Sequence, residues 1–187
     1  NPSFALTNQL RVFGSIATGF KAPSLYQLFS SAGNPELKAE KSINYETGIQ
    51  YNANNIRQRL VYFYREIETG LDFDYISFVY YNIPNQVVRG IEYEVNITPV
   101  PNLSINANYT YLNGNDFIQS RISAKDTAYS YLLRRPKHHI NLNLGYQFEN
   151  GFYIALQGKY LSKRNDVGGY RKADVELNDY FLAGAYA

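Results

Sequence analysis

The sequence predicts an all-β protein, an antiparallel transmembrane β-barrel with about eight strands in this chain. Apolar and polar side chains alternate over stretches of about ten to fourteen residues, which is the period of a strand whose two faces differ. Long connections, such as residues 21–40, alternate with short ones, such as residues 53–56. Tight turns on one side of a bilayer and long loops on the other are typical of outer-membrane barrels.

Each predicted strand has one apolar face and one polar face. In the second stretch, Ile43, Tyr45 and Ile49 share a face, while Asn44 and Glu46 lie on the opposite one. The same alternation recurs along the chain and is less regular only in the last stretch. The predicted strands are residues 10–16, 43–52, 59–65, 89–98, 103–111, 139–148, 154–160 and 172–186.

The polar face distinguishes a barrel from a soluble β-sandwich, which is the main alternative. A sandwich exposes a polar face rich in Lys and Glu, whereas Asn, Gln, Ser, Thr and Gly dominate here and suit a crowded aqueous lumen. The 19 Tyr and 11 Phe among 187 residues supply the rings that concentrate at membrane interfaces, although Trp is absent. No apolar run reaches the roughly eighteen residues of a spanning helix. These features favour the barrel.

Composition excludes several classes of function. A net charge of +2 is too small to indicate a nucleic-acid partner, and without Cys there is no disulfide or thiol chemistry. The only histidines, His138 and His139, are neighbours on a predicted strand and point to opposite faces, so they cannot bind one metal together or form a catalytic pair. We therefore expect neither an enzyme nor a metal or cofactor site.

The long connection after the first strand contains a predicted helical turn. Pro23 presets φ, Ser24 begins the turn, and Leu25, Leu28 and Phe29 recur at helical spacing. We expect this segment to pack as an anchored turn at the rim of the barrel, with an architectural role.

Aromatic residues in two other long connections are the candidate ligand contacts, because binding residues concentrate in loops. Rings offer broad apolar area to a bulky solute, and Arg can hold carboxylate or phosphate groups. The alternative role for these residues is contact with lipid at the membrane interface. Arg134 and Arg135 are predicted to be adjacent in a strand, so at most one of them points inward. The candidates are Phe73, Tyr75, Phe78, Tyr80 and Tyr81 after the third strand, and Tyr129, Tyr131 and Arg134 at the outer end of the sixth.

Several runs of residues resemble those of TonB-dependent outer-membrane receptors. The main run comprises residues 17–29 (ATGFKAPSLYQLF), 33–42 (GNPELKAEKS) and 45–48 (YETG). Residues 89–92 (RGIE) are similar to the next recurrent element of that family. Residues 132–138 (LLRRPKH) resemble the version found in the vitamin B12 receptor and its siderophore-receptor relatives.

The resemblance implies the architecture of a larger protein. Such receptors have a barrel of about 22 strands around an N-terminal plug, and this chain would form roughly strands 13 to 20. Residues 1–187 are then a single domain, the C-terminal part of the barrel, with the plug and the final strands outside it. The resemblance further implies a place in the bacterial outer membrane, in contact with its lipid, and energy supplied by the TonB complex through the plug.

The expected function is active uptake of a scarce, bulky nutrient that binds at the extracellular loops. The resemblance leaves the ligand open between cobalamin and a ferric siderophore, which stand at near parity. The alternative function is a small passive outer-membrane barrel or an adhesin-like surface protein. A plug encoded upstream would favour the receptor, whereas a signal peptide directly before Asn1 would favour the small barrel.

Overall fold

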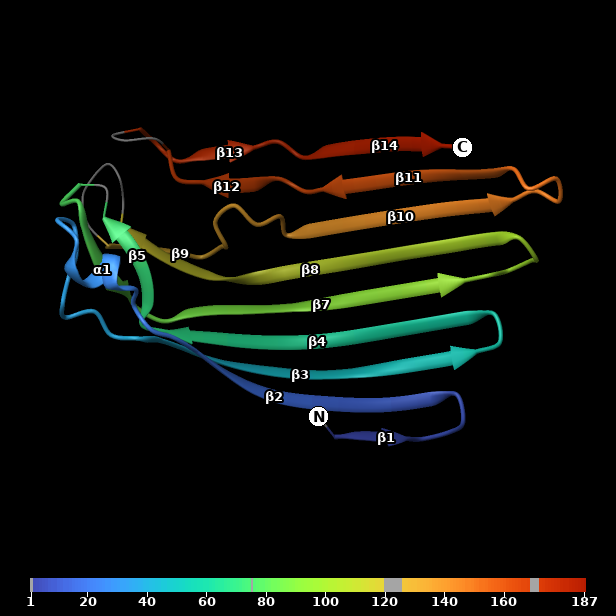
Figure 1. The fold of residues 1–187 in the computed structure, drawn as a ribbon, viewed down its shortest axis with the longest axis horizontal. Helices are drawn as coiled ribbons and strands as arrows, with labels where there is room; N and C mark the ends of the chain where they lie inside the picture. The colour runs from blue at the N-terminus through green and yellow to red at the C-terminus, as the bar shows by residue number, and fades with distance from the viewer. Residues whose placement is uncertain (1, 75, 120–125, 169–171) are drawn as a thin grey trace.

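The computed structural model describes residues 2–74, 76–119, 126–168 and 172–187. Within these ranges the chain forms one long antiparallel sheet of ten strands in the order β1-β2-β3-β4-β7-β8-β10-β11-β14, with β9 paired to β8 (Figure 1). Two further two-stranded sheets are formed by β5 with β6 and by β12 with β13. The predicted antiparallel all-β fold is confirmed.

Seven of the eight predicted stretches each correspond to one long strand, whereas the last, residues 172–186, contains both β13 and β14. A further and shorter strand, β1, pairs with β2, and short strands occur within the long connections. The elements are β1 (Ser3–Ala5), β2 (Leu10–Lys21), α1 (Leu25–Phe29), β3 (Glu40–Ala53), β4 (Ile56–Glu68), β5 (Gly70–Asp74), β6 (Val79–Ile83), β7 (Gln86–Ile97), β8 (Leu103–Gln119), β9 (Asp126–Tyr129), β10 (His138–Gln147), β11 (Tyr153–Leu161), β12 (Arg164–Asp166), β13 (Val175–Leu177) and β14 (Tyr180–Tyr186). No helix among the described residues has the length and hydropathy needed to span a membrane.

The register aligns the apolar faces of neighbouring strands. Directly opposed residues lie on the same face of a sheet, so a chain of pairings can be followed from β1 to β14. Every position in one such row is apolar or aromatic, and we call this face the apolar face. The row is Phe4, Val12, Ile49, Leu60, Tyr93, Tyr109, Ile140, Tyr160 and Phe181.

The adjacent row lies on the opposite face and is polar from β2 to β11. Two of its pairs interact directly. The Asn141 side-chain amide donates to Asn108 Oδ1 (2.7 Å), and Arg59 lies 3.8 Å from Glu94. The row is Arg11, Gln50, Arg59, Glu94, Asn108, Asn141 and Lys159, and we call this the polar face.

The polar face also carries two phenylalanine rings, each lying over a glycine of the neighbouring strand. The Phe13 ring covers Gly48, and the Phe63 ring covers Gly90. A Cβ at either glycine would collide with the ring above it, so glycine is required for this close approach. The Arg59 guanidinium lies 5.2 Å from the Phe13 ring centroid. Rings that shield strand glycines in this way help to fix the register of the sheet.

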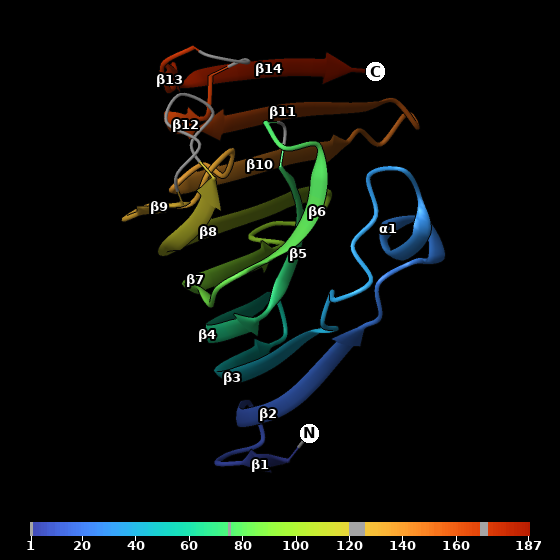
Figure 2. The same ribbon diagram turned by 90° about the vertical axis from the view of Figure 1, so that its left-hand side faces the viewer.

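The two ends of the sheet differ as the connection lengths predict. The turns between β3 and β4, between β7 and β8 and between β10 and β11 gather at one end, and α1, the β5–β6 hairpin and the β12–β13 pair lie at the other (Figure 1). Viewed toward this long-loop end, the sheet is curved, and α1 and the β5–β6 hairpin lie on its concave side (Figure 2). The two connections that carry α1 and the β5–β6 hairpin therefore fold over the interior of the curve (Figure 2).

The predicted helical turn is present as α1. Ser24 is its N-cap, and a capping box is complete, because the Gln27 N–H donates to Ser24 Oγ (3.2 Å) and the Ser24 N–H donates to Gln27 Oε1 (2.8 Å). The expected packing of its apolar residues is wrong for two of the three. Leu25 and Phe29 are 76% and 69% exposed, because no other segment among the described residues covers the face that they share.

Candidate ligand-binding loops

Two long connections are joined by hydrogen bonds into one unit, which we call the hairpin unit. It consists of residues 22–39, including α1, and the β5–β6 hairpin. The Tyr80 N–H donates to the Ala32 carbonyl (3.1 Å), and the Asn34 side-chain amide donates to the Tyr80 carbonyl (3.1 Å). Asn82 accepts from the Lys38 N–H (2.8 Å) and donates to the Lys38 carbonyl (2.9 Å). Segments more than forty residues apart in sequence are thereby held in one arrangement.

Four rings of the hairpin unit form a continuous aromatic surface, which we call the ring cluster. Phe73 and Tyr80 are directly opposed in the hairpin, and their ring centroids lie 4.9 Å apart. Phe78 lies 6.4 Å from Phe73 and is 62% exposed. Tyr26 of α1 lies 6.3 Å from Tyr80 and is 67% exposed. The cluster therefore combines edge-to-face ring contacts within the hairpin with two rings that remain accessible.

The structure separates Tyr81 from the ring cluster. Tyr81 follows Tyr80 in β6 and opposes Asp72, so its side chain lies on the opposite face of the hairpin. Tyr75 lies outside the described residues. Sequence reasoning missed Tyr26, because nothing in the local pattern indicates that α1 meets a hairpin some fifty residues later along the chain.

The second candidate region is a compact loop cluster. Tyr129, Leu133 and Val167 are buried against one another, with Tyr131 packed on the outside. The Tyr129 hydroxyl donates to Asp174 Oδ2 (3.0 Å), which joins the β8–β10 connection to the β11–β14 connection. Burial and this hydrogen bond raise the pKa of Tyr129 to about 12. We call this set of residues the loop core.

Tyr129, at 6% exposure, is a packing residue of the loop core. Its ring centroid lies 5.3 Å from that of Tyr131, which is half-buried. Burial raises the pKa of Tyr131 as well, with a further contribution from Asp174. Of these two tyrosines, Tyr131 has the more accessible side chain.

The prediction that Arg134 and Arg135 are neighbours in a strand is wrong. Both precede β10, and Arg134 has a φ of +61°, which ends the extended conformation. Arg134 Nε donates to Asp166 Oδ1 (2.7 Å), and the Arg134 N–H donates to the Asn165 carbonyl (2.7 Å). The residue therefore ties the loop core to β12 while its side chain remains 60% exposed.

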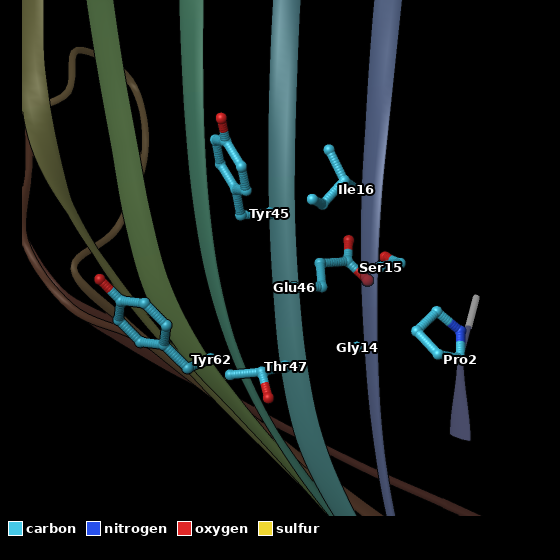
Figure 3. A pocket seen from close by; sticks show the side chains of 8 residues that line it. All are labelled: Pro2, Gly14, Ser15, Ile16, Tyr45, Glu46, Thr47 and Tyr62. Atoms are coloured by element: carbon cyan, nitrogen blue, oxygen red, sulfur yellow. The ribbon is translucent and has the colours of Figure 1, made fainter. Parts of the chain in front are cut away.

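One hollow on the sheet lies apart from these loops. It has a volume of about 570 Å³ and is bounded by side chains of β2, β3 and β4 (Figure 3). Ile16, Tyr45 and Tyr62 belong to the apolar face, whereas Glu46 belongs to the polar one. The hollow therefore lies along the strands and is not part of either loop region. Among the described residues, no group of three or more His, Asp or Glu side chains is arranged to hold a metal ion.

Comparison with known proteins places this geometry in a family. A model of the family "TonB dependent receptor-like, beta-barrel" matches residues 1–187. The ferric enterobactin receptor of Pseudomonas aeruginosa is 30% identical over 98% of this chain. The chain spans only 29% of the length of that relative.

Solved structures show the same fold at lower identity. A mutant form of the P. aeruginosa ferric enterobactin receptor has a TM-score of 0.76 at 22% identity, with 98% of this chain and 31% of that chain covered. A siderophore receptor of Acinetobacter baumannii has a TM-score of 0.74 at 17% identity, with 98% of this chain and 33% of that chain covered. A copper transporter has a TM-score of 0.75 at 16% identity, with 98% of this chain and 29% of that chain covered. The chain thus belongs to the TonB-dependent receptor family, as part of its outer-membrane β-barrel.

Proposed function

We propose that the chain belongs to a receptor that binds a ferric siderophore at its long-loop end and imports it with energy from the TonB complex. The observation that carries the proposal is the ring cluster, which lies on the concave side of the sheet at the end where the long loops gather (Figure 2). The ferric enterobactin receptor, 30% identical over nearly the whole chain, supports iron chelates over cobalamin. None of the relatives named above is a cobalamin receptor.

The chemistry of the ring cluster suits such a ligand. A siderophore wraps iron in a bulky shell whose exterior is largely organic, and aromatic side chains offer large contact areas at a low cost in conformational entropy. The partly exposed rings of Phe78 and Tyr26 extend the surface beyond the edge-to-face pair of Phe73 and Tyr80. Arg65 lies exposed on the polar face near the long-loop end of β4, where it would attract an anionic iron chelate. In this proposal Arg134 supports the loop core and Tyr131 is a peripheral contact.

The small passive barrel and the adhesin receive no comparable support. The family model covers the entire chain, and its members are receptors of the TonB-dependent class. Uptake then requires two further partners outside this chain, the plug and the TonB complex, and contact with outer-membrane lipid along the apolar face.

The test is equilibrium binding by the full-length receptor. Phe73→Ala and Tyr80→Ala should each weaken binding of a ferric catecholate by about 1 to 3 kcal/mol, the scale of a buried aromatic contact. Tyr81→Ala, from the opposite face of the same hairpin, should change affinity by less than about 0.5 kcal/mol. Phe152→Ala removes an exposed ring at the short-turn end and should leave affinity unchanged.

A ligand panel identifies the cargo class. A ferric catecholate, a ferric hydroxamate and cobalamin should be compared for binding, and for uptake by cells with and without TonB. Tight binding of cobalamin alone would refute the siderophore assignment. Uptake of iron that is equal in both strains would refute the TonB-dependent mechanism.

A further inference from the structure

Five side chains form a cationic and aromatic patch at the long-loop end of the apolar face, which we call the cation patch. It consists of Arg89 on β7, Tyr109 and Tyr111 on β8, Lys137 just before β10, and His138, the first residue of β10. Tyr111 and His138 are directly opposed, and their ring centroids lie 5.4 Å apart. The Lys137 ammonium lies 5.7 Å from the centroid of the Tyr111 ring.

Hydrogen bonding fixes the orientation of the imidazole. The Tyr109 hydroxyl lies 2.9 Å from His138 Nδ1, and the two rings are nearly parallel at a centroid distance of 6.1 Å. Where the hydroxyl donates to Nδ1, the imidazole hydrogen resides on Nε2. His138 then keeps a donor at Nε2 in addition to its contact with Tyr109.

The register places Arg89 beside this group. Arg89 opposes Asn113, and the next pair on the same face toward the short turns is Ile91 with Tyr111. The Arg89 side chain is exposed. Lys137 and His138 thus lie against the Tyr111 ring, and Arg89 lies at a diagonal position from Tyr111 on the same face.

The cation patch lies where the apolar surface ends. On the side of the short turns the apolar face continues through the rows that contain Ile140 and Leu142, whereas Asn113 and Asn115 follow on the side of the long loops. Tyrosines and basic residues at such a boundary are characteristic of the level at which hydrocarbon gives way to lipid headgroups. The loops lie beyond this level, so the patch faces the outer leaflet.

The positive charge of the cation patch is not matched by acidic residues on the same face of β8 and β10. The residues of β8 and β10 on the apolar face include no Asp or Glu, since Asp116 belongs to the opposite face. On the apolar face, the acidic residue nearest in the register is Glu66 of β4, the strand that pairs with β7. Glu66 opposes Val87, and the Asn85 side-chain amide donates to Glu66 Oε1 (3.2 Å). An anion that approaches Tyr111 therefore meets Arg89, Lys137 and His138 before it meets a carboxylate.

We propose that the cation patch docks the phosphate group of an outer-leaflet lipid, whose acyl chains lie along the apolar rows below. The two cations supply the charge, His138 supplies a directional donor at Nε2 when its Nδ1 accepts from Tyr109, and the Tyr111 ring lies against Lys137 and His138 at headgroup level. This site is separate from the ring cluster, which lies on the concave side of the sheet, so the proposal does not depend on the identity of the transported ligand.

The test measures lipid binding by the purified full-length receptor in detergent micelles. Bisphosphorylated lipid A and its dephosphorylated form serve as probes. The native receptor should prefer the phosphorylated form. Arg89→Gln with Lys137→Gln should weaken that binding about 25-fold, at about fivefold for each cation removed near the headgroups.

The matched control removes a positive charge from the polar face of the sheet. Lys159→Gln lies on the polar face of β11 and should leave lipid binding unchanged. Lys137→Arg keeps the charge and should retain binding. Loss of binding in Lys159→Gln equal to that in the double variant, or no loss in the double variant, would overturn the proposal. Complete displacement of the lipid by millimolar inorganic phosphate would show a free-anion site and would overturn it as well.

Discussion

Replacing Leu142 with arginine should destabilise the membrane-inserted protein strongly, whereas replacing its neighbour Asn143 should not. Leu142 opposes Ala107 and Gly158 on the apolar face, and Asn143 opposes Asn106 and Gln157 on the polar face. The two residues differ by one position in β10, so they share depth in the bilayer and differ only in the face that they occupy.

The depth of Leu142 in the bilayer follows from its position in β10. Leu142 lies four residues from His138, about 13 Å along the strand, and five from Gln147, about 17 Å. With a strand tilt of about 40°, these lengths correspond to roughly 10 Å and 13 Å along the membrane normal, which places Leu142 close to the middle of a hydrocarbon core about 30 Å thick. A cation facing lipid at that depth costs about 2 to 4 kcal/mol.

The assay is reversible unfolding of the full-length receptor from lipid vesicles by denaturant, with heat-modifiable migration as a check on assembly. Leu142→Arg should lose about 2 to 4 kcal/mol, and Asn143→Arg should lose less than about 1 kcal/mol, since its side chain faces water in the lumen. Similar losses for both variants would refute the assignment of the two faces, and a larger loss for Asn143→Arg would reverse it.

Two further predictions concern the loop core and the edges of the sheet. Tyr129 should keep its proton up to pH about 12 in the folded state against 10 when unfolded, so the stability of the loop core should fall as pH rises from 10 through 12. Phenolate absorbance and hydrogen exchange should show this fall. Tyr129→Phe should remove one of the late-titrating phenolates and, because the hydrogen bond to Asp174 is lost, should destabilise the loop core by about 1 to 3 kcal/mol at neutral pH. The strands β1 and β14 end the sheet without pairing to each other, so this chain expressed alone should not give a monodisperse, heat-resistant barrel, and a well-behaved monomer with strand-rich circular dichroism would contradict this.

The strands could be predicted from the sequence because their signal is local. In a barrel wall each residue faces lipid or lumen according to its parity, so the alternation through Ile140, Asn141 and Leu142 reports the environment directly. The register follows from the same signal, since a slip of one residue would place every apolar side chain on the polar face. The lumen face was predicted less well. Phe13 and Phe63 are apolar residues on that face, and only the paired glycines of the neighbouring strands explain them.

The candidate site was harder to predict because it depends on contacts between distant segments. Adjacency of Tyr80 and Tyr81 indicates an aromatic stretch, but only the β5–β6 pairing shows that the two rings lie on opposite faces. Tyr129 is a residue type that suits a ligand contact, but it lies in the environment of a core residue, because Val167 and Asp174 reach it from a distant part of the chain. The short helix was predicted from Pro23, Ser24 and the spacing of the apolar residues that follow, but its contact with the hairpin through Tyr26 was not.

We expect the strand framework and the ligand specificity of this protein to be carried by different residues. Barrels named as siderophore receptors and as a copper transporter match this chain equally well, with TM-scores of 0.74 to 0.76 at 16% to 22% identity, so the strands alone do not distinguish one cargo from another. Strand positions are constrained by lipid on one side and water on the other, and that constraint is the same for any ligand. The hairpin unit is not under that constraint, and it holds α1 and the β5–β6 hairpin in one fixed arrangement through backbone and asparagine hydrogen bonds. Exchanging the rings of that unit should change the ligand while the sheet beneath it stays the same.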